Sequence, residues 1–252
     1  MIPIKSKKEI EMMAEAGKIA AEVLREVLDS VKPGVTTMEL EKIADAGITK
    51  RGAKPSFKMV EDYNFATCIN INDGLVHGLP NDYKIKKGDL VSIDMGAFLN
   101  GFHSDLSYTV EVESNKEAKF LEIGKKALQA GISQCVPGNH IGDISSAVQK
   151  IVEGAGHTVS RDLVGHGIGR ELHEDPYIPG YGKVGKGSGI REGMVFAVEI
   201  IYQKGSPEIL IDADDWTIST ADGSLAGLFE HTVAVEKTGP RVLTQEGGFV
   251  TI

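Results

Sequence analysis

Four stretches of the chain place apolar residues three and four positions apart, which is the spacing of an amphipathic helix. Capping boxes, in which a Ser or Thr is followed three residues later by Glu, open the first two stretches. Pro33-Gly34 ends the first stretch and Pro137-Gly138 ends the third, which we expect Asn115 to cap. The expected helices cover residues 6–32, 36–52, 115–136 and roughly 144–153.

The two helical pairs resemble each other. Aligning Pro33-Gly34 with Pro137-Gly138 gives an offset of 104 residues, at which several apolar positions coincide. Two unrelated helix-Pro-Gly-helix units would also align this well, so coincidence stays open. A true repeat would predict two similar halves with a site between their sheets. The matched positions are Ile19 with Ile123, Leu24 with Leu128, Leu28 with Ile132, and Leu40 with Ile144.

Between the helical pairs, β-prone sequence surrounds the turn signal Asn100-Gly101, which predicts a two-residue hairpin because both residues tolerate positive φ. Opposed residue numbers then sum to 201, which puts Asp105 across from Gly96 and two residues along from Asp94. Alternate residues of a strand share a face, so Asp94 and Asp105 share one, about 7–8 Å apart at the backbone. The expected strand segments are residues 65–71 and 89–112, with a loop over residues 53–63 and a turn at residues 77–80.

Carboxylates in this setting suggest a metal ion. Asp94 and Asp105 on a largely buried face would repel each other and take up protons unless a cation kept them ionised. Alternatively, one Asp faces solvent and the other caps a turn. Glu199 and Glu230 pose the same problem of buried negative charge, because each lies in an apolar run typical of a buried strand. An Arg or Lys partner would explain one buried Glu, but few basic residues lie in these segments to neutralise four carboxylates.

Histidines supply a possible nitrogen ligand. His166 lies between Gly165 and Gly167, which allow a close backbone approach and leave the imidazole unobstructed, and His173 follows seven residues later. A single His among glycines is also often structural. Four carboxylates and one neutral His would balance two divalent cations, and an oxygen-rich set favours Mn²⁺, Fe²⁺, Co²⁺ or Zn²⁺. Because paired metal ions activate water and polarise carbonyl groups, the residues predict a dinuclear hydrolase.

Length, composition and charge indicate the class of protein and the compartment in which this chemistry would take place. The 252 residues, 41% hydrophobic, can bury a sizeable core, and we expect one catalytic domain over residues 1–252. We expect no membrane span, since no apolar stretch approaches ~20 residues. The first residues lack the apolar region of a signal peptide, and two cysteines make no disulfide framework, so we expect a cytoplasmic protein. The net charge of −9 argues against nucleic acid as a partner.

On the basis of these residues, the chain resembles the type I methionine aminopeptidases over nearly its whole length. All five metal-binding positions of that family are filled. The resemblance implies an α+β "pita-bread" fold, in which two pseudo-symmetric α/β halves and a curved antiparallel sheet surround a dinuclear metal site. The resembling stretches are residues 72–80, 92–105, 165–176, 193–199 and 216–232, the last of which contains Glu230-His231-Thr232.

The resemblance also implies roles for the residues. Asp94 would bind one metal ion, His166 and Glu199 would bind the other, and Asp105 and Glu230 would bridge both. Glu199 would accept a proton from the attacking water while His173 stabilises the oxyanion. The remaining family positions are His77 near the scissile amide, and Tyr63, Cys68, Leu172 and Trp216 around the methionine side chain, although such apolar residues are commonly plain core.

Three features depart from the family pattern. Ile200 replaces the proline that usually follows the strand glutamate, Leu172 replaces a more common aromatic residue, and the loop over residues 57–63 diverges. None of them touches an expected ligand. We expect the backbone after Glu199, the shape of the pocket and the preference for the second substrate residue to differ accordingly.

The expected activity is removal of the N-terminal methionine from nascent polypeptides, with the ribosome as a possible meeting place, by a monomer. Two alternatives stay open at this point. One is a same-fold aminopeptidase that cleaves before proline, which the sequence around Glu230 disfavours. The other is a non-catalytic binding protein of the same fold, although such relatives tend to lose metal ligands and this chain keeps them all.

Overall fold

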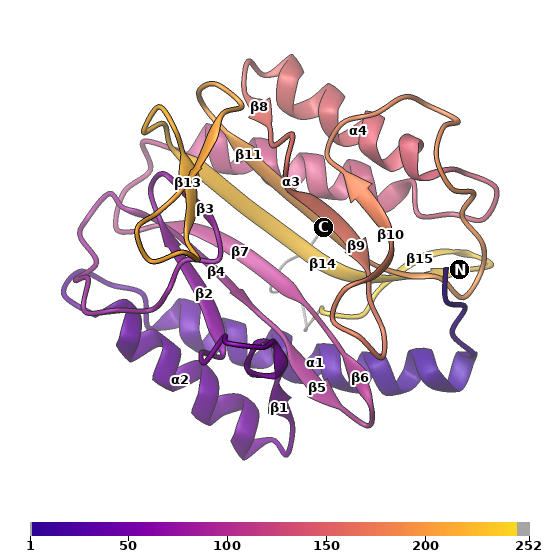
Figure 1. Cartoon of the computed structure of the whole chain (residues 1–252), viewed down its shortest axis with the longest axis horizontal. Coiled ribbons are helices and arrows are strands. Elements are labelled where there is room, and N and C mark those ends of the chain that lie inside the picture. Colours follow the sequence, from indigo (N-terminus) through magenta and orange to yellow (C-terminus); the bar gives the residue numbers. More distant parts are fainter. Residues whose placement is uncertain (1, 246–252) are drawn as a thin grey trace.

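A curved antiparallel sheet of nine strands runs through the middle of the structure, a computed structural model that describes residues 2–245 (Figure 1). Within that part of the chain the strand order is β10-β9-β11-β14-β7-β4-β2, with β8 paired to β11 and β15 to β14. These strands are β2 (Thr67–Ile71), β4 (Leu90–Met95), β7 (Leu106–Glu111), β8 (Thr158–Val159), β9 (Val164–Gly167), β10 (Glu174–Pro179), β11 (Val195–Gln203), β14 (Ala226–Glu236) and β15 (Gly239–Val242).

Two three-stranded sheets lie beside the large one. In one of them β1 pairs with β5, which forms the tip of the predicted hairpin with β6, and strands β12, β13 and β3 form the second small sheet. A short 3₁₀ helix, η1, follows β1. The bounds of these elements are β1 (Lys54–Pro55), η1 (Phe57–Met59), β3 (Gly74–Val76), β5 (Ala97–Leu99), β6 (Phe102–His103), β12 (Ile209–Ile211) and β13 (Ile218–Thr220).

Two pairs of helices cover the two halves of the large sheet, α1 and α2 at the bottom of Figure 1 and α3 and α4 at the top. The capping boxes predicted for α1 and α2 are present, with the Ser6 and Thr36 side chains accepting hydrogen bonds from the Glu9 and Glu39 amides. No helix within residues 2–245 has the length and apolar character needed to cross a membrane. The helices are α1 (Lys7–Asp29), α2 (Thr37–Lys50), α3 (Ala118–Ser133) and α4 (Ile141–Gly154).

The helix pairs keep the offset of 104 residues that the sequence suggested. Helices α2 and α4 begin and end at residues separated by this offset, and so do the last residues of α1 and α3. Gly52 and Gly156, which follow α2 and α4, both have φ of +80°. Strands β1 and β8, which come next, have the same offset. The repeated sequence pattern therefore corresponds to a repeated arrangement of elements.

Residue alternation explains why the carboxylates lie on the face of the sheet that the helices leave free. Val91, Ile93 and Met95 of β4 pack in one core with α1 and α2. Phe196, Val198 and Ile200 of β11 pack in another core with α3 and α4. Asp94 and Glu199 occupy the intervening positions of the same two strands, so they point away from the helices. Ile200, the residue that replaces a usual proline, is thus a fully buried core residue.

The hairpin has the predicted register. Asn100 and Gly101 have φ of 54° and 84°, and Leu99 pairs with Phe102. The same sum of 201 continues into the large sheet, where Asp94 pairs with Ser107. The ladder is interrupted at Gly96 and Asp105 themselves, because the Asp105 amide donates to the Thr232 hydroxyl of β14 instead, 2.9 Å away.

Several element boundaries differ from the prediction. Helix α3 begins at Ala118 and Asn115 does not cap it, since the side chain of Glu111 accepts hydrogen bonds from the amides of residues 116 and 117 at that end. Helix α4 begins three residues earlier than expected, where the His140 amide donates to Asp143. The expected loop over residues 53–63 contains β1 and η1, because the pairing of β1 with β5 is not visible in local sequence.

Candidate metal centre

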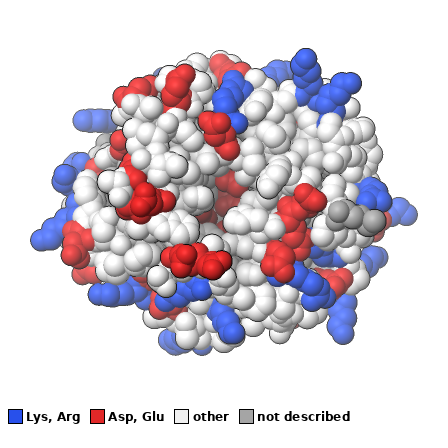
Figure 2. Space-filling model, viewed as in Figure 1, with Lys and Arg blue, Asp and Glu red and all other residues white. Residues whose placement is uncertain are grey.

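A cavity of about 280 Å³ opens on the helix-free face of the sheet. Figure 2 shows a hollow near the centre of this view with acidic side chains inside it, while Lys and Arg lie mostly toward the rim. Each residue singled out from the sequence lines this cavity. They are Tyr63, Cys68, His77, Asp94, Asp105, His166, Leu172, His173, Glu199, Trp216 and Glu230.

Strand register brings the four carboxylates together. Glu199 of β11 lies directly opposite Glu230 of β14. Asp94 of β4 and Glu230 both lie opposite Ser107 of β7, one on each side of that strand. Asp105 precedes β7 on the same face as Ser107, two residues away. The four side chains therefore come from four neighbouring segments of one sheet and converge on one point.

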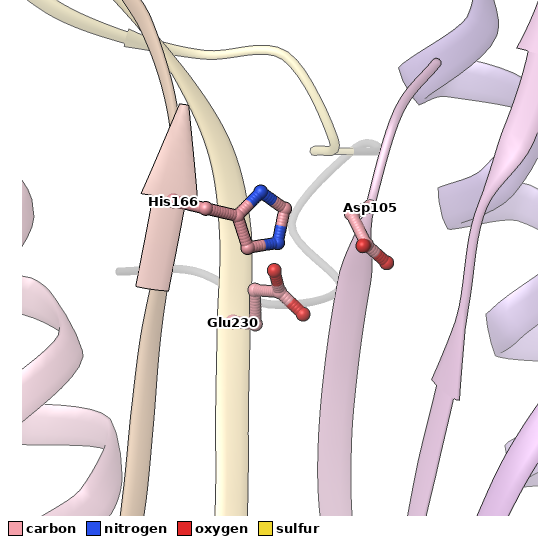
Figure 3. A group of neighbouring side chains, drawn as sticks. All are labelled: Asp105, His166 and Glu230. Atoms are coloured by element: carbon pink, nitrogen blue, oxygen red, sulfur yellow. The ribbon is translucent and has the colours of Figure 1, made fainter. Parts of the chain in front are cut away.

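His166 enters this group from β9. Its Nδ1 lies 2.9 Å from the Gly167 carbonyl oxygen, and this contact requires Nδ1 to carry the proton and leaves Nε2 with a free lone pair. Nε2 lies 3.9 Å from Glu199 Oε1. Figure 3 shows His166, Asp105 and Glu230 pointing toward one another, and one ligand atom of each lies within 4.8 Å of the others. A side chain in place of Gly165 would crowd the Ala197 carbonyl oxygen, which explains one of the flanking glycines.

Three of the four carboxylates each have one oxygen without the partner that buried charge requires. Oδ1 of Asp94, Oδ1 of Asp105 and Oε1 of Glu230 are buried and accept no hydrogen bond within the described part of the chain. No Lys or Arg is among the described residues that line the cavity. Burial raises the pKa of Asp94 to about 7. Burial, followed by repulsion from neighbouring carboxylates, raises the pKa values of Asp105, Glu199 and Glu230 well above their ordinary range.

This donor set fits divalent metal ions. Unpartnered carboxylate oxygens are the hard ligands that such ions prefer, and a cation would remove the repulsion that raises the carboxyl pKa values. Burial lowers the pKa of His166 to about 3, so its imidazole is neutral and able to coordinate. The residues present therefore suit a site of two divalent cations.

Two further histidines face the cavity. The His173 ring packs edge-on against the His166 ring, with 4.4 Å between ring centroids. His77 follows β3 with φ of 59°, and the next amide, that of Gly78, donates to the Asn70 side chain and holds the turn. Loss of hydration lowers the pKa values of both His77 and His173, so both rings are neutral near pH 7 and each carries one N–H donor.

The rest of the cavity wall is apolar. The rings of Tyr63 and Trp216 meet edge to face, with centroids 4.9 Å apart. The Tyr63 hydroxyl lies 2.8 Å from the Thr67 carbonyl oxygen and 3.1 Å from Cys68 Sγ, which fixes the ring in the wall. Phe57 and Val60 also line the cavity, although the sequence did not single them out. The divergence of their loop from the family pattern is the one sequence signal that marks them.

Comparison with known proteins places this arrangement in a family. The sequence profile of metallopeptidase family M24 matches residues 11–237. A methionine aminopeptidase of Clostridium perfringens is 44% identical, and the alignment covers 97% of this chain and 99% of that protein. Methionine aminopeptidase 1 of Bacillus subtilis is 42% identical, and the alignment covers 97% of this chain and 100% of that protein. The crystal structure of methionine aminopeptidase from Thermotoga maritima superposes with a TM-score of 0.94 at 40% identity, covering 98% of this chain and all of that one.

Proposed function

This chain belongs to metallopeptidase family M24, and we propose that it removes the N-terminal methionine from polypeptides by hydrolysing their first peptide bond. One observation carries the proposal: four carboxylates and a neutral His converge beside an apolar wall in a single cavity. The identity to proteins named methionine aminopeptidase over nearly the whole chain supports it. The expected pita-bread fold is likewise that of the methionine aminopeptidases to which the structure is similar.

We assign the ligands as the family resemblance suggests. Asp94 would bind one divalent ion, His166 and Glu199 the other, and Asp105 and Glu230 both. When bound, two such ions lower the pKa of water and polarise the substrate carbonyl group. The free oxygens of Asp94, Asp105 and Glu230 support this assignment, because they are buried without hydrogen-bond donors.

Three side chains would act directly on the attacking water and the peptide bond. Glu199 would accept the proton of the attacking water, since it borders the cavity and its carboxylate lies near His166. His173 would donate a hydrogen bond to the carbonyl oxygen as negative charge develops there. His77, which also lines the cavity, would contact the leaving amide. Neutral imidazoles suit both contacts because each ring retains one N–H.

The apolar wall would hold the methionine side chain. Tyr63, Cys68, Leu172 and Trp216 present aromatic, aliphatic and sulfur atoms, which pack well against a flexible thioether. A cavity of about 280 Å³ accommodates one such side chain and the adjoining peptide group rather than a long peptide segment. Phe57 and Val60, from the divergent loop, would add two more apolar contacts at this end.

Release of free methionine tests the proposal. Metal-stripped protein would be reloaded with Mn²⁺, Co²⁺, Fe²⁺ or Zn²⁺ and given Met-Ala-Ser, Leu-Ala-Ser and peptides with proline in second position. We expect metal-dependent release from Met-Ala-Ser and little release from the others. Cleavage confined to the proline peptides would replace the proposal with a proline-specific activity. Metal binding without cleavage of any peptide would indicate a binding protein.

We further propose that the substrates are newly made polypeptides met in the cytoplasm, at the ribosome, and that the protein acts as a monomer. Two free buried cysteines suit a reducing compartment. The cavity already holds every side chain that the proposed chemistry uses, so this chemistry needs no second subunit. Light scattering coupled to gel filtration would test the monomer, with a dimer mass as the contrary result. Co-sedimentation with ribosomes would test the partner, with protein left wholly in the supernatant as the contrary result.

A further inference from the structure

The loop between β9 and β10, residues 168–173, carries two of the residues that line the cavity, Leu172 and His173. Two backbone hydrogen bonds attach this loop to neighbouring segments, from His103 N to Gly169 O at 2.8 Å and from Ile168 N to Val195 O at 3.1 Å. Both lie at the beginning of the loop. The position of His173 at its far end depends on other contacts.

Glu174, the residue after His173, organises that far end. Its Oε1 accepts hydrogen bonds from the amides of Arg170, at 2.8 Å, and Glu171, at 3.4 Å, so it closes the loop on itself. Its Oε2 accepts a hydrogen bond from Lys5 Nζ at 2.5 Å. The Lys5 and Glu174 side chains are only 5% and 9% exposed, so this ion pair is shielded from water.

Lys5, which lies 169 residues before Glu174 in the chain, is itself held in place by a backbone hydrogen bond. Its amide donates to the Gly193 carbonyl oxygen at 2.7 Å, and Gly193 lies shortly before β11, the strand of Glu199. The packing around its side chain is close, since a Cβ atom added to Gly169 would lie 2.5 Å from Lys5 Cε. Burial lowers the pKa of Lys5, and the hydrogen bond to Glu174 opposes that shift.

We propose that Lys5 is a positioning residue for His173, acting through Glu174 and the loop over residues 168–173. The inference rests on the proposed function, in which His173 donates to the substrate carbonyl oxygen. A buried carboxylate that loses its cation draws in water or moves toward solvent, and Glu174 cannot move without releasing the two amides that it holds. Because Glu174 adjoins His173 in the chain, the imidazole would move with it.

A double-mutant cycle distinguishes positioning from a general structural role. We expect Lys5→Met to lower kcat for Met-Ala-Ser by on the order of 10- to 100-fold, with KM and metal content little changed, since small misplacements of a catalytic group have effects of this size. In the His173→Ala background the same substitution should cause no further loss. An equal loss in both backgrounds, or an unchanged kcat in Lys5→Met alone, would overturn the proposal.

Two further variants guard against a folding defect. Lys5→Arg keeps a buried cation beside Glu174, and we expect it to lose clearly less kcat than Lys5→Met despite its larger head group. Arg170→Met is the matched control, because it removes an exposed ion pair, with Glu9, from the same loop. Exposed pairs contribute little, so kcat should stay within about twofold. A loss in Arg170→Met as large as in Lys5→Met would contradict a specific role for Lys5.

A measurement that needs no activity separates this proposal from the proposed function. Methionine release by the unsubstituted protein tests the function by itself. The NMR resonances of the ¹⁵N-labelled His173 ring test the positioning, and they should shift in Lys5→Met but not in Arg170→Met. Unmoved resonances in Lys5→Met would reject the role of Lys5, whether or not the protein releases methionine.

Discussion

The two faces of strand β2 show two ways to bury a carboxylate. On the helix side, Glu41 of α2 is 5% exposed, and its oxygens accept hydrogen bonds from the Ala66 amide, the Thr67 amide and the Thr67 hydroxyl, at 2.6–2.9 Å. On the cavity side, one residue further along β2, Cys68 borders carboxylates with unpartnered oxygens. Asp105 and Glu230 there are as buried as Glu41, at 4% and 3% exposed.

The difference lies in the donors and not in the burial. Burial raises the carboxyl pKa in both places, but three donors oppose the shift at Glu41, whereas neighbouring carboxylates add to it in the cavity. A buried carboxylate supplied with donors fastens a helix to a strand. Buried carboxylates that face each other, with oxygens left without donors, stay ionised only with a cation from outside the chain. Donor supply therefore distinguishes Glu41, a structural carboxylate, from the carboxylates that we propose as metal ligands.

The largest expected effect comes from the cavity side. Asp105→Asn keeps the shape of the side chain but removes a charge that both metal ions would share. We expect metal loading and methionine release to be lost together, with release at background. Metal content by atomic emission and release from Met-Ala-Ser would be measured on the same sample. Activity retained in this variant with metal fully bound would show that Asp105 is no ligand.

The next largest effect concerns His173, which we propose acts beside the metal ligands without binding metal itself. His173→Ala should retain metal and lower kcat by about 10²- to 10³-fold, the usual cost of removing a donor to a developing oxyanion. Metal content and kcat are again the readouts. If the variant loses much of its metal, His173 binds metal and belongs with His166.

On the helix side of β2, Glu41→Ala should lower the free energy of unfolding and leave metal binding and methionine release unchanged. The substitution leaves the Ala66 and Thr67 amides without their acceptor, which costs about 2–5 kcal/mol of unfolding free energy and roughly 2–4 °C in Tm for each kcal/mol. Glu41→Gln, which keeps an acceptor, should lose less than half as much. Denaturant titration would measure both. The distinction fails if metal affinity falls in Glu41→Ala as it does in Asp105→Asn.

A smaller effect is expected on the melting temperature of metal-free protein when the pH is raised. The folded carboxyl pKa values in the metal-free cavity are raised, to about 7 for Asp94, whereas unfolded carboxyls titrate near 4. Their contribution to stability is therefore complete below about pH 4 and is lost as pH rises toward 7 and above. Chelated protein should melt on the order of 5 °C lower at pH 8 than at pH 5.5. Metal-loaded protein should lose less, and identical profiles for the two forms would contradict the assignment.

The features of the fold and of the site that depend on local sequence were predictable. Asn100-Gly101 sets a register, and strand alternation then places Asp94 and Asp105 on one face without knowledge of any other contact. The repeat at 104 residues likewise follows from local helix signals, Pro33-Gly34 and its counterpart. Residue types alone indicated a metal pair, because carboxylates outnumber cations in the apolar segments.

The non-local parts were not predictable from residue patterns. Periodicity tells which face a residue occupies but not which strand lies alongside, so the direct pairing of Glu199 with Glu230 needed the fold. The same holds for Glu41, whose donors are 25 and 26 residues away, and for Lys5 and Glu174. The cavity residues Phe57 and Val60 sit in a loop whose position depends on pairing between β1 and β5.

Anomalous diffraction from crystals soaked with Mn²⁺ would show whether the cavity binds two cations, because it locates cations without relying on turnover. We expect two peaks in the cavity, about 3.5–4 Å apart, each in contact with Asp105 and Glu230. We expect no peak at Glu41, whose oxygens already have their donors. A cavity without peaks, or a peak at Glu41 as strong as any in the cavity, would contradict the claim that unpartnered carboxylates mark the metal site.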